Sequence, residues 1–186
     1  MHKLRPGAVI TTRDLVTTRS QRIRLPDPTG VVHLQFRRYA GCPFCNLHLR
    51  SVAQRHHELV AAGIREVAMF QSPAAELLAQ QGDVPFAVIA DPERKLYAEF
   101  GVASSPRAIL DPRAWLAGVR AVTKKRPSLP ANRQQALGLP ADFLLAANGH
   151  VLACKYGMHA YDQWSADDLL HLASKHIRTT DHRLRP

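Results

Sequence analysis

Three short apolar runs alternate with stretches of helical spacing in the first half of the chain, and this alternation restricts the fold more than any other feature. The runs are residues 31–36, 64–70 and 86–90. Residues 43–62 carry apolar side chains at helical spacing, and Gly63 is expected to end that helix. Further helices are predicted over residues 73–81 and 95–100. Strands and helices in this order indicate an α/β fold with parallel strand pairing.

The last third of the chain has a different pattern. Residues 142–147 and 151–156 are predicted strands, and the Asn148-Gly149 pair between them favours a tight hairpin turn. Ser165 is an expected N-cap for a closing helix over residues 166–176. A parallel section followed by an antiparallel hairpin and a helix is the layout of the thioredoxin fold. We therefore predict an α/β, thioredoxin-like fold with a central mixed sheet flanked by helices.

We expect residues 1–186 to form a single thioredoxin-like domain with three additions. These are an N-terminal extension (1–30), an insertion before the C-terminal hairpin (102–138) and a loose tail (177–186). Residues 8–10 and 23–25 are expected to pair as a short hairpin in the extension. One helical patch over residues 111–122 interrupts the proline-rich insertion, which we expect to pack on the core or cover it.

Length and hydropathy set the expected compartment. A chain of 186 residues can bury a sizeable core without disulfide bonds. No apolar run approaches the ~20 residues of a membrane span, and no apolar stretch typical of a signal peptide follows the start. We therefore expect a cytoplasmic protein with no membrane contact, in which two close cysteines are catalytic or bind a metal.

The net charge of +10 and the pI near 10.2 raise the question of nucleic-acid binding. The basic residues are spread along the chain and form neither a basic helix nor a mixed basic and aromatic RNA motif. The sequence therefore predicts no specific nucleic-acid partner. The charge is better explained by solubility or by attraction of an anionic substrate.

The segment Cys42-Pro43-Phe44-Cys45 joins a predicted strand to a predicted helix. Cys42 would occupy the helix N-cap, where free backbone N–H groups and the helix dipole stabilise a thiolate. Such a thiol has a lowered pKa and is a nucleophile. Cys45 lies one turn further on, close enough to attack a mixed disulfide on Cys42. Since side chains alternate along a strand, only one of Arg37 and Arg38 faces the thiol, and we expect it to be Arg38.

Other interpretations of the cysteines stay open. The pair could be half of a zinc site completed by His48 or by His56 and His57, or it could be chemically inert. Cys154 lies in a predicted hairpin strand, where it would be a buried apolar thiol or a second resolving cysteine.

Four segments resemble the peroxiredoxin-like branch of the AhpC/TSA proteins. They are the strand end and cysteine motif in 36–49, the Asp-Pro-Glu-Arg-Lys-Leu-Tyr run within 85–97, the hairpin within 139–151 and the C-terminal segment 156–164. The resemblance covers about residues 28–175, and the cysteine segment is its most specific part. It implies a thioredoxin-like fold in which Cys42 is the peroxidatic or attacking thiol and Cys45 resolves it.

The resemblance also implies that Pro140 is the cis proline that lies against the cysteine pair in thioredoxin folds. The chain departs from the family pattern at two positions near Cys42. Gln35 and Tyr39 stand where typical peroxiredoxins have Pro and a Thr or Ser. Phe36 stands where thioredoxins have an acidic residue.

These observations predict a thiol-dependent antioxidant oxidoreductase. The Cys42 thiolate would attack a hydroperoxide or a disulfide, and Cys45 would close an internal disulfide. A thiol reductant, such as a thioredoxin or a low-molecular-weight thiol, would reopen it. The prediction includes no cofactor and no metal, and it allows an oligomer. The alternative is a non-catalytic thioredoxin-fold binding module with a structural or zinc-binding cysteine pair.

Overall fold

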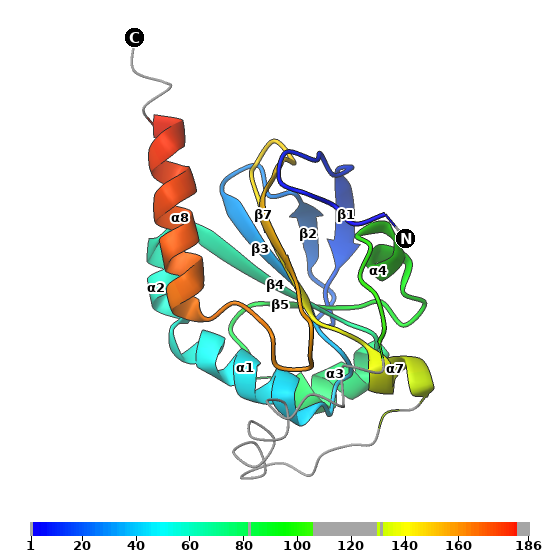
Figure 1. Ribbon diagram of the computed structural model, residues 1–186. Helices are drawn as coiled ribbons and strands as arrows, with labels where there is room; N and C mark the ends of the chain where they lie inside the picture. Colours follow the sequence, from blue (N-terminus) through cyan, green and yellow to red (C-terminus); the bar gives the residue numbers. More distant parts are fainter. Residues whose placement is uncertain (1, 82, 106–129, 131, 182–186) are drawn as a thin grey trace.

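The computed structural model describes residues 2–81, 83–105, 130 and 132–181, and its centre is a five-stranded mixed sheet (Figure 1). The strands are β3 (Val31–Phe36), β4 (Ile64–Phe70), β5 (Ala87–Ala90), β6 (Ala141–Leu145) and β7 (Val151–Tyr156), in the order β5-β4-β3-β6-β7. β3 pairs in parallel with β4 and antiparallel with β6. The sheet therefore has the parallel half and the antiparallel hairpin of a thioredoxin-like fold, which confirms the predicted fold class.

The described helices are α1 (Pro43–Gln54), α2 (His56–Ala61), α3 (Ala74–Gln81), α4 (Lys95–Glu99), α7 (Arg133–Leu137) and α8 (Ala166–Asp181). The helix predicted over residues 43–62 is thus two helices, because Arg55 leaves helical geometry between them. Gly63 follows α2 with φ of 75°, and Gly101 follows α4 with φ of 68°, so both glycines take the left-handed conformation that ends helices.

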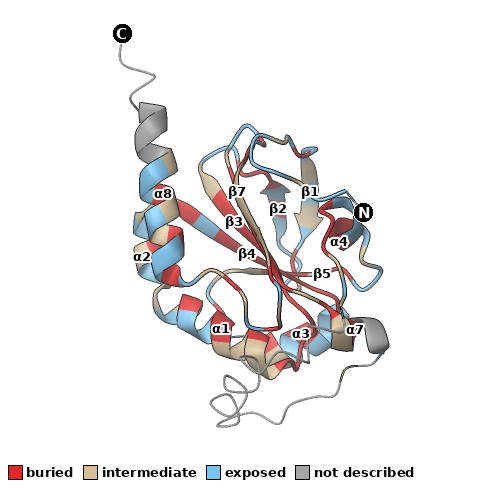
Figure 2. Ribbon diagram, viewed as in Figure 1, coloured by how far each residue is buried: buried red, intermediate tan, exposed pale blue. Residues whose placement is uncertain are grey.

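One face of the sheet is apolar. Alternate residues of the central strands, among them Leu34, Phe36 and Phe143, pack with Tyr97 and Phe100 from the α4 region. The rings of Phe36 and Phe143 meet edge to face, with centroids 5.7 Å apart. Figure 2 shows buried residues concentrated on the central strands and on the inner faces of the helices.

The opposite face is covered by α1, α2, α3 and α8. Leu49 of α1 and Leu77 of α3 lie over Phe70, while Leu59 of α2 and Leu169 of α8 pack together further along. This is the face toward which the cysteine helix turns its buried side. The sheet thus carries an aromatic core on one side and the cysteines on the other.

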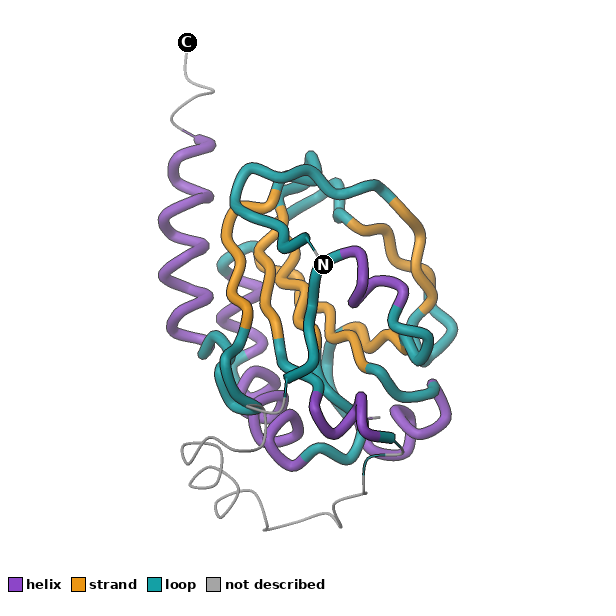
Figure 3. The backbone as a smooth tube through the Cα atoms, turned by 45° about the vertical axis from the view of Figure 1, so that its right-hand side comes forward, coloured by secondary structure: helices purple, strands orange, loops and turns teal. Residues whose placement is uncertain are grey.

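The N-terminal hairpin differs from the prediction. It consists of β1 (Arg13–Val16) and β2 (Arg22–Leu25), so residues 8–10 are not its first strand. Instead, Val9 bridges His150, and the amide of Ile10 donates to the carbonyl of Gly149 at 3.0 Å. Figure 3 shows this N-terminal stretch beside the β6–β7 hairpin. Residues 8–10 are extended, but they pair with Gly149 and His150 near the other end of the chain instead of with residues 23–25.

The C-terminal helix begins as predicted and ends later. Ser165 and Asp168 form a capping box, in which the Asp168 amide donates to Ser165 Oγ at 3.2 Å and the Ser165 amide donates to Asp168 Oδ2 at 2.8 Å. α8 continues to Asp181, so a loose tail from residue 177 was a wrong prediction for residues 177–181. None of the described helices is long and apolar enough to cross a membrane.

Only the ends of the predicted insertion belong to the described part of the chain. Ser104 bridges Gly138, and the amide of Ser105 donates to the carbonyl of Leu137, so the two ends of the insertion are joined. α7 precedes this junction, with Asn132 as its N-cap. The helical patch predicted over residues 111–122 lies outside the described residues.

Candidate active site

The end of β3 and the start of α1 bring the two cysteines into one buried site. Cys42 is the N-cap of α1, and Pro43 occupies the first turn, where the absent N–H removes no helical hydrogen bond. The Cys42 amide donates to the carbonyl of Tyr39 at 3.1 Å, which holds the connecting loop as a turn. Both cysteines are free thiols with no exposed surface.

The surroundings of Cys42 favour its thiolate. Burial alone would raise the pKa of this thiol. Hydrogen bonding from the Cys45 side chain, the charge of Arg38 and the backbone amides of Cys45 and Phe44 outweigh burial and bring the pKa to about 7. Arg38 Nη1 lies 3.6 Å from Cys42 Sγ. The helix start, the second cysteine and the arginine therefore act together on one sulfur atom.

Cys45 is the weaker acid of the pair. Burial and the adjacent Cys42 sulfur raise its pKa well above the ordinary value, although the Arg38 charge opposes them. The backbone amide of Arg38 lies 3.5 Å from Cys45 Sγ, so Arg38 meets one thiol with its side chain and the other with its main chain. This asymmetry suits an attacking thiolate at Cys42 and a protonated resolving thiol at Cys45.

Arg37 points away from the cysteines, as strand alternation predicts. Its side chain is fully buried and donates to Asp142 Oδ1 at 2.7 Å and to Gln35 Oε1 at 2.7 Å. The same Nη2 atom lies 3.0 Å from His48 Nε2. Burial and the neighbouring guanidinium lower the pKa of His48, so its ring is a neutral acceptor. The two adjacent arginines thus serve two different buried regions.

The buried side chain of Arg37 belongs to a larger polar network, which the sequence did not predict. His33 links Glu66 Oε2, 2.8 Å from its Nδ1, to Asp142 Oδ1, 3.2 Å from its Nε2. Burial lowers the pKa of His33, but the two carboxylates outweigh it and raise the pKa to about 9. Gln35 also donates to Glu66 Oε2 at 2.6 Å. The alternation of His33, Gln35 and Arg37 with apolar residues was the available signal, but it is equally typical of a strand with one face in water.

The described part of α7 contacts two residues near the thiols. Arg38 Nη2 donates to the carbonyl of Ala136, and Gln135 Nε2 donates to the carbonyl of Gln71 at 3.1 Å. Arg38 therefore joins α7 to Cys42. Because neither cysteine has exposed surface, an oxidant reaches Cys42 only when the residues around it move.

Pro140 lies directly before β6, and the peptide bond preceding it is trans. The expectation of a cis proline at this position was wrong, since the cis bond among the described residues joins Leu25 to Pro26. Pro140 is buried, and its carbonyl accepts from the Gly157 amide at 2.9 Å. Because Ala141 pairs with Phe36, Pro140 stands at the end of β3 from which the arginines emerge. It thus borders the site from the neighbouring strand.

The histidines proposed as zinc ligands lie elsewhere. His48 Nε2 contacts the guanidinium of Arg37, and the centroid of the His56 ring lies 5.8 Å from that of Phe86. Among the described residues, no three His, Cys, Asp or Glu side chains come together as a metal site. Cys154 is half-buried on β7, and its Sγ lies 3.5 Å from the carbonyl of Leu4, so it belongs to another part of the molecule.

Comparison with known proteins agrees with this geometry. The sequence profile of the AhpC/TSA family matches residues 6–154, most of the chain, and the match includes both cysteines of α1. The chain belongs to the AhpC/TSA family. No curated protein sequence matches it closely enough to count as a relative.

Solved structures share the fold of this AhpC/TSA protein at low sequence identity. Peroxidoxin BcpB of Mycobacterium tuberculosis is 16% identical with a TM-score of 0.66, over 94% of this chain and 99% of its own. A protein assigned as thiol:disulfide interchange protein DsbE of Chlorobium tepidum is 20% identical with a TM-score of 0.61, over 92% and 99%. The reduced 2-Cys peroxiredoxin of Plasmodium vivax is 12% identical with a TM-score of 0.68, over 96% and 84%. At these identities the similarity establishes the thioredoxin-like fold.

Proposed function

We propose that this AhpC/TSA protein is a thiol-dependent antioxidant oxidoreductase in which Cys42 attacks the oxidant and Cys45 resolves the product. The observation that carries the proposal is the placement of Cys42 at the N-cap of α1, with Arg38 Nη1 3.6 Å from its sulfur and the Cys45 thiol hydrogen-bonded to it. A thiol with a pKa of about 7 is substantially ionised at neutral pH. Cys42 is therefore ready to react without an added base.

With a hydroperoxide, the Cys42 thiolate attacks the terminal peroxide oxygen and the O–O bond breaks. Cys42 becomes a sulfenic acid and the oxidant leaves as an alcohol, or as water when the oxidant is hydrogen peroxide, after taking up a proton. The Cys45 thiol then attacks the sulfenic sulfur, which forms the Cys42–Cys45 disulfide and releases water. Arg38 would stabilise the thiolate first and the developing negative charge on the leaving oxygen afterwards.

With a disulfide, Cys42 forms a mixed disulfide and releases one thiolate, and Cys45 then displaces the second. Both oxidants leave the same internal disulfide. An external thiol reductant, such as a thioredoxin or a low-molecular-weight thiol, returns it to two thiols and is itself oxidised to a disulfide. The names of the structural neighbours include peroxiredoxins and a thiol:disulfide interchange protein, so both oxidants belong in the test.

Pro140 would act by position rather than by chemistry. Its place before β6, beside the end of β3, would fix the backbone that borders the thiol site. Gln35 and Tyr39 stand where typical peroxiredoxins have Pro and Thr or Ser, and Gln35 is hydrogen-bonded to Arg37. In this proposal the polar contact to the oxidant therefore comes from Arg38.

Stopped-flow measurement of the reduced protein tests the proposal. The protein is mixed in turn with hydrogen peroxide, an organic hydroperoxide and a small disulfide, and the products are mapped by mass spectrometry. We expect rapid loss of two thiols and a Cys42–Cys45 disulfide. Cys42→Ser should abolish the reaction, and Cys45→Ser should stop it at the sulfenic acid or mixed disulfide. Cys154→Ser is the matched control, because Cys154 lies away from the site. Thiols that react no faster than free cysteine at the same pH would refute the proposal.

A further inference from the structure

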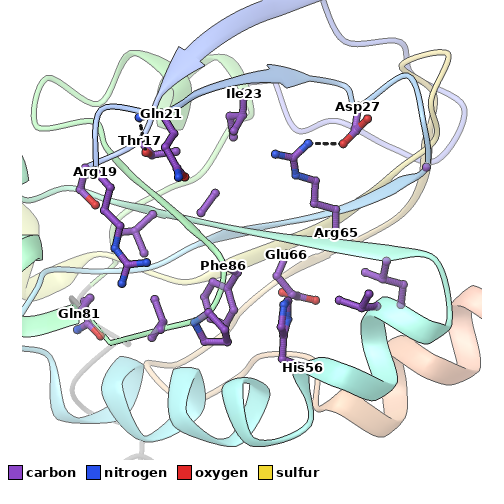
Figure 4. A pocket seen from close by; sticks show the side chains of 18 of the residues that line it. Thr17, Arg19, Gln21, Ile23, Asp27, His56, Arg65, Glu66, Gln81 and Phe86 are labelled. Carbon is purple, nitrogen blue, oxygen red and sulfur yellow. Dashed lines mark hydrogen bonds and ion pairs between the residues drawn. The ribbon is translucent and has the colours of Figure 1, made fainter.

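A second polar site lies away from the cysteines. A cavity of about 650 Å³ opens between the β1–β2 hairpin, the beginnings of β4 and β5, and α2. Neither cysteine of α1 lines it. Figure 4 shows Glu66, His56 and Phe86 on the side of the cavity nearest the helices, while the ion pair of Arg65 with Asp27 lies nearest the hairpin.

Two buried polar atoms in this wall lack hydrogen-bond partners. Within the described part of the chain, neither Glu66 Oε1 nor His56 Nδ1 has one. Glu66 is only 1% exposed, so this is a buried carboxylate oxygen left without a donor. Buried polar atoms are almost always hydrogen-bonded, and an unpaired carboxylate oxygen is costly. Both residues line the cavity, and a donor that binds there and displaces the neighbouring side chains would supply the missing hydrogen bonds.

The other carboxylate oxygen is held firmly. His33 and Gln35 contact Glu66 Oε2 at 2.8 and 2.6 Å, which orients the carboxylate and leaves Oε1 as the unpaired oxygen, and Figure 4 shows the Glu66 side chain beside His56. A neutral imidazole protonated on Nε2 presents Nδ1 as an acceptor as well. The orientation of the Glu66 carboxylate is thus set before any ligand arrives.

The charges behind the wall favour a neutral ligand. Glu66 and Asp142 are matched by Arg37 and by His33, whose pKa is raised to about 9 by these carboxylates against the effect of burial. Glu66 therefore supplies an acceptor without an excess negative charge. The net charge of +10 on the whole chain also opposes the approach of a cation.

The remaining wall suits a flat ring. Phe86 is half-buried and lies with its centroid 5.8 Å from the His56 ring, and Val60 and Ile64 add apolar surface. We propose that this cavity binds a neutral amino-substituted heteroaromatic ring, whose exocyclic amino group donates one hydrogen to Glu66 Oε1 and the other to His56 Nδ1 while the ring lies against Phe86. This inference does not depend on the proposed thiol chemistry.

Two related probes test the proposal directly. Purified protein labelled with ¹⁵N is titrated with 2-aminopyrimidine and, separately, with pyrimidine, which has the ring without the amino group. We expect saturable shifts of the amide resonances of residues 63–66 and 86–88 with 2-aminopyrimidine. Pyrimidine should bind at least about 10-fold more weakly, since sites built for a hydrogen-bond donor reject analogues that lack it. Equal binding of the two probes, or no saturable shift with either, would overturn the proposal.

Matched variants assign the binding to the wall. His56→Phe keeps a ring beside Phe86 but removes the acceptor, and it should weaken 2-aminopyrimidine binding about 10-fold or more. His57→Phe is the same substitution at the adjacent exposed position and should leave binding unchanged. Glu66→Gln should weaken binding as well, and His56→Phe carries the test if Glu66→Gln does not fold. Cys42→Ser should bind like the wild type, so a failure of the thiol chemistry would not affect this result.

Discussion

Arg37 and Arg38 are neighbours in sequence, but they enter two buried regions that are organised in opposite ways. On the Arg37 side, two carboxylates, an arginine and a protonated histidine neutralise one another through short hydrogen bonds. On the Arg38 side, one arginine meets two thiols, Cys42 with its guanidinium and Cys45 with its backbone amide. Among the described residues, Arg38 Nε and both side-chain polar atoms of Gln71 have no partner there.

Because their charges are arranged differently, the Arg37 region should contribute mainly to stability and the Arg38 region mainly to reactivity. Buried opposite charges that are paired hold strands together but are expensive to separate, because each partner left alone is a buried charge. A thiol site in which the cation is shared between a sulfur and a carbonyl of α7 can exchange these contacts for an oxidant. Substitutions on the Arg37 side should therefore change unfolding, and substitutions on the Arg38 side should change reaction rates.

The largest effect is expected from breaking the Arg37 pair. Asp142→Asn leaves the guanidinium without its carboxylate in a fully buried place and should lower the free energy of unfolding by about 3–5 kcal/mol. Urea unfolding followed by circular dichroism measures the change. Asp167→Asn is the matched control, since the Asp167 side chain is 81% exposed and its ion pair should contribute less than about 1 kcal/mol. Similar losses for the two variants would remove the distinction between the regions.

The next effect is the pH dependence of stability through His33. Its pKa is raised to about 9 in the folded protein, against 6.5 for a free histidine, because the two carboxylates outweigh burial. The folded state therefore binds the proton more tightly. The stabilisation is complete below pH 6.5 and is lost as the pH rises through 9, by about 3 kcal/mol.

The thiols must be removed for this measurement, because the lowered pKa of Cys42 gives a slope of the opposite sign. We expect the Cys42→Ser/Cys45→Ser protein to lose stability between pH 6.5 and 9 in urea titrations. A constant or rising free energy of unfolding over this interval would mean that the network holds His33 uncharged.

In the Arg38 region, Arg38→Ala should lower the reaction rate of the Cys42 thiol. Without the guanidinium, the pKa of Cys42 should rise above 7, and the thiol should react about ten times more slowly at neutral pH. The pH dependence of iodoacetamide alkylation, with Cys154→Ser as background, measures both quantities. Arg50→Ala changes an exposed arginine of α1 and serves as the control. An unchanged pKa would show that the helix start and Cys45 suffice to activate the sulfur.

The smallest predicted effect concerns the hydrogen bond that Gln135 of α7 donates near the thiols. Gln135→Ala removes the hydrogen bond from α7 to the carbonyl of Gln71 and should expose Cys42 more often. We expect a two- to five-fold faster reaction of Cys42 with hydrogen peroxide, as an order of magnitude for the loss of one net hydrogen bond. Gln54→Ala, on the exposed side of α1, is the matched control. A slower reaction would indicate that α7 helps to form the site rather than restrict access to it.

Local signals in the sequence determined the elements and the first catalytic candidates. Alternating apolar runs, the turn at Asn148-Gly149 and the capping box at Ser165 depend on neighbours within a few residues, so the strands of the central sheet and the start of α8 were predictable, whereas β1 and α7 were not. The N-cap position of Cys42 and the direction of Arg38 followed from the same local geometry, since a strand end and a helix start fix where nearby side chains point.

Only the tertiary structure decided which residues meet from distant strands and helices. His33, Glu66 and Asp142 are far apart in sequence, and their contacts exist because β3 lies between β4 and β6 under the cover of α1 and α8. The contacts of α7 with Arg38 and Gln71 also join residues that are far apart in sequence. Sequence patterns record the local preference of each segment, whereas burial and charge pairing arise from the surfaces that these segments present to one another.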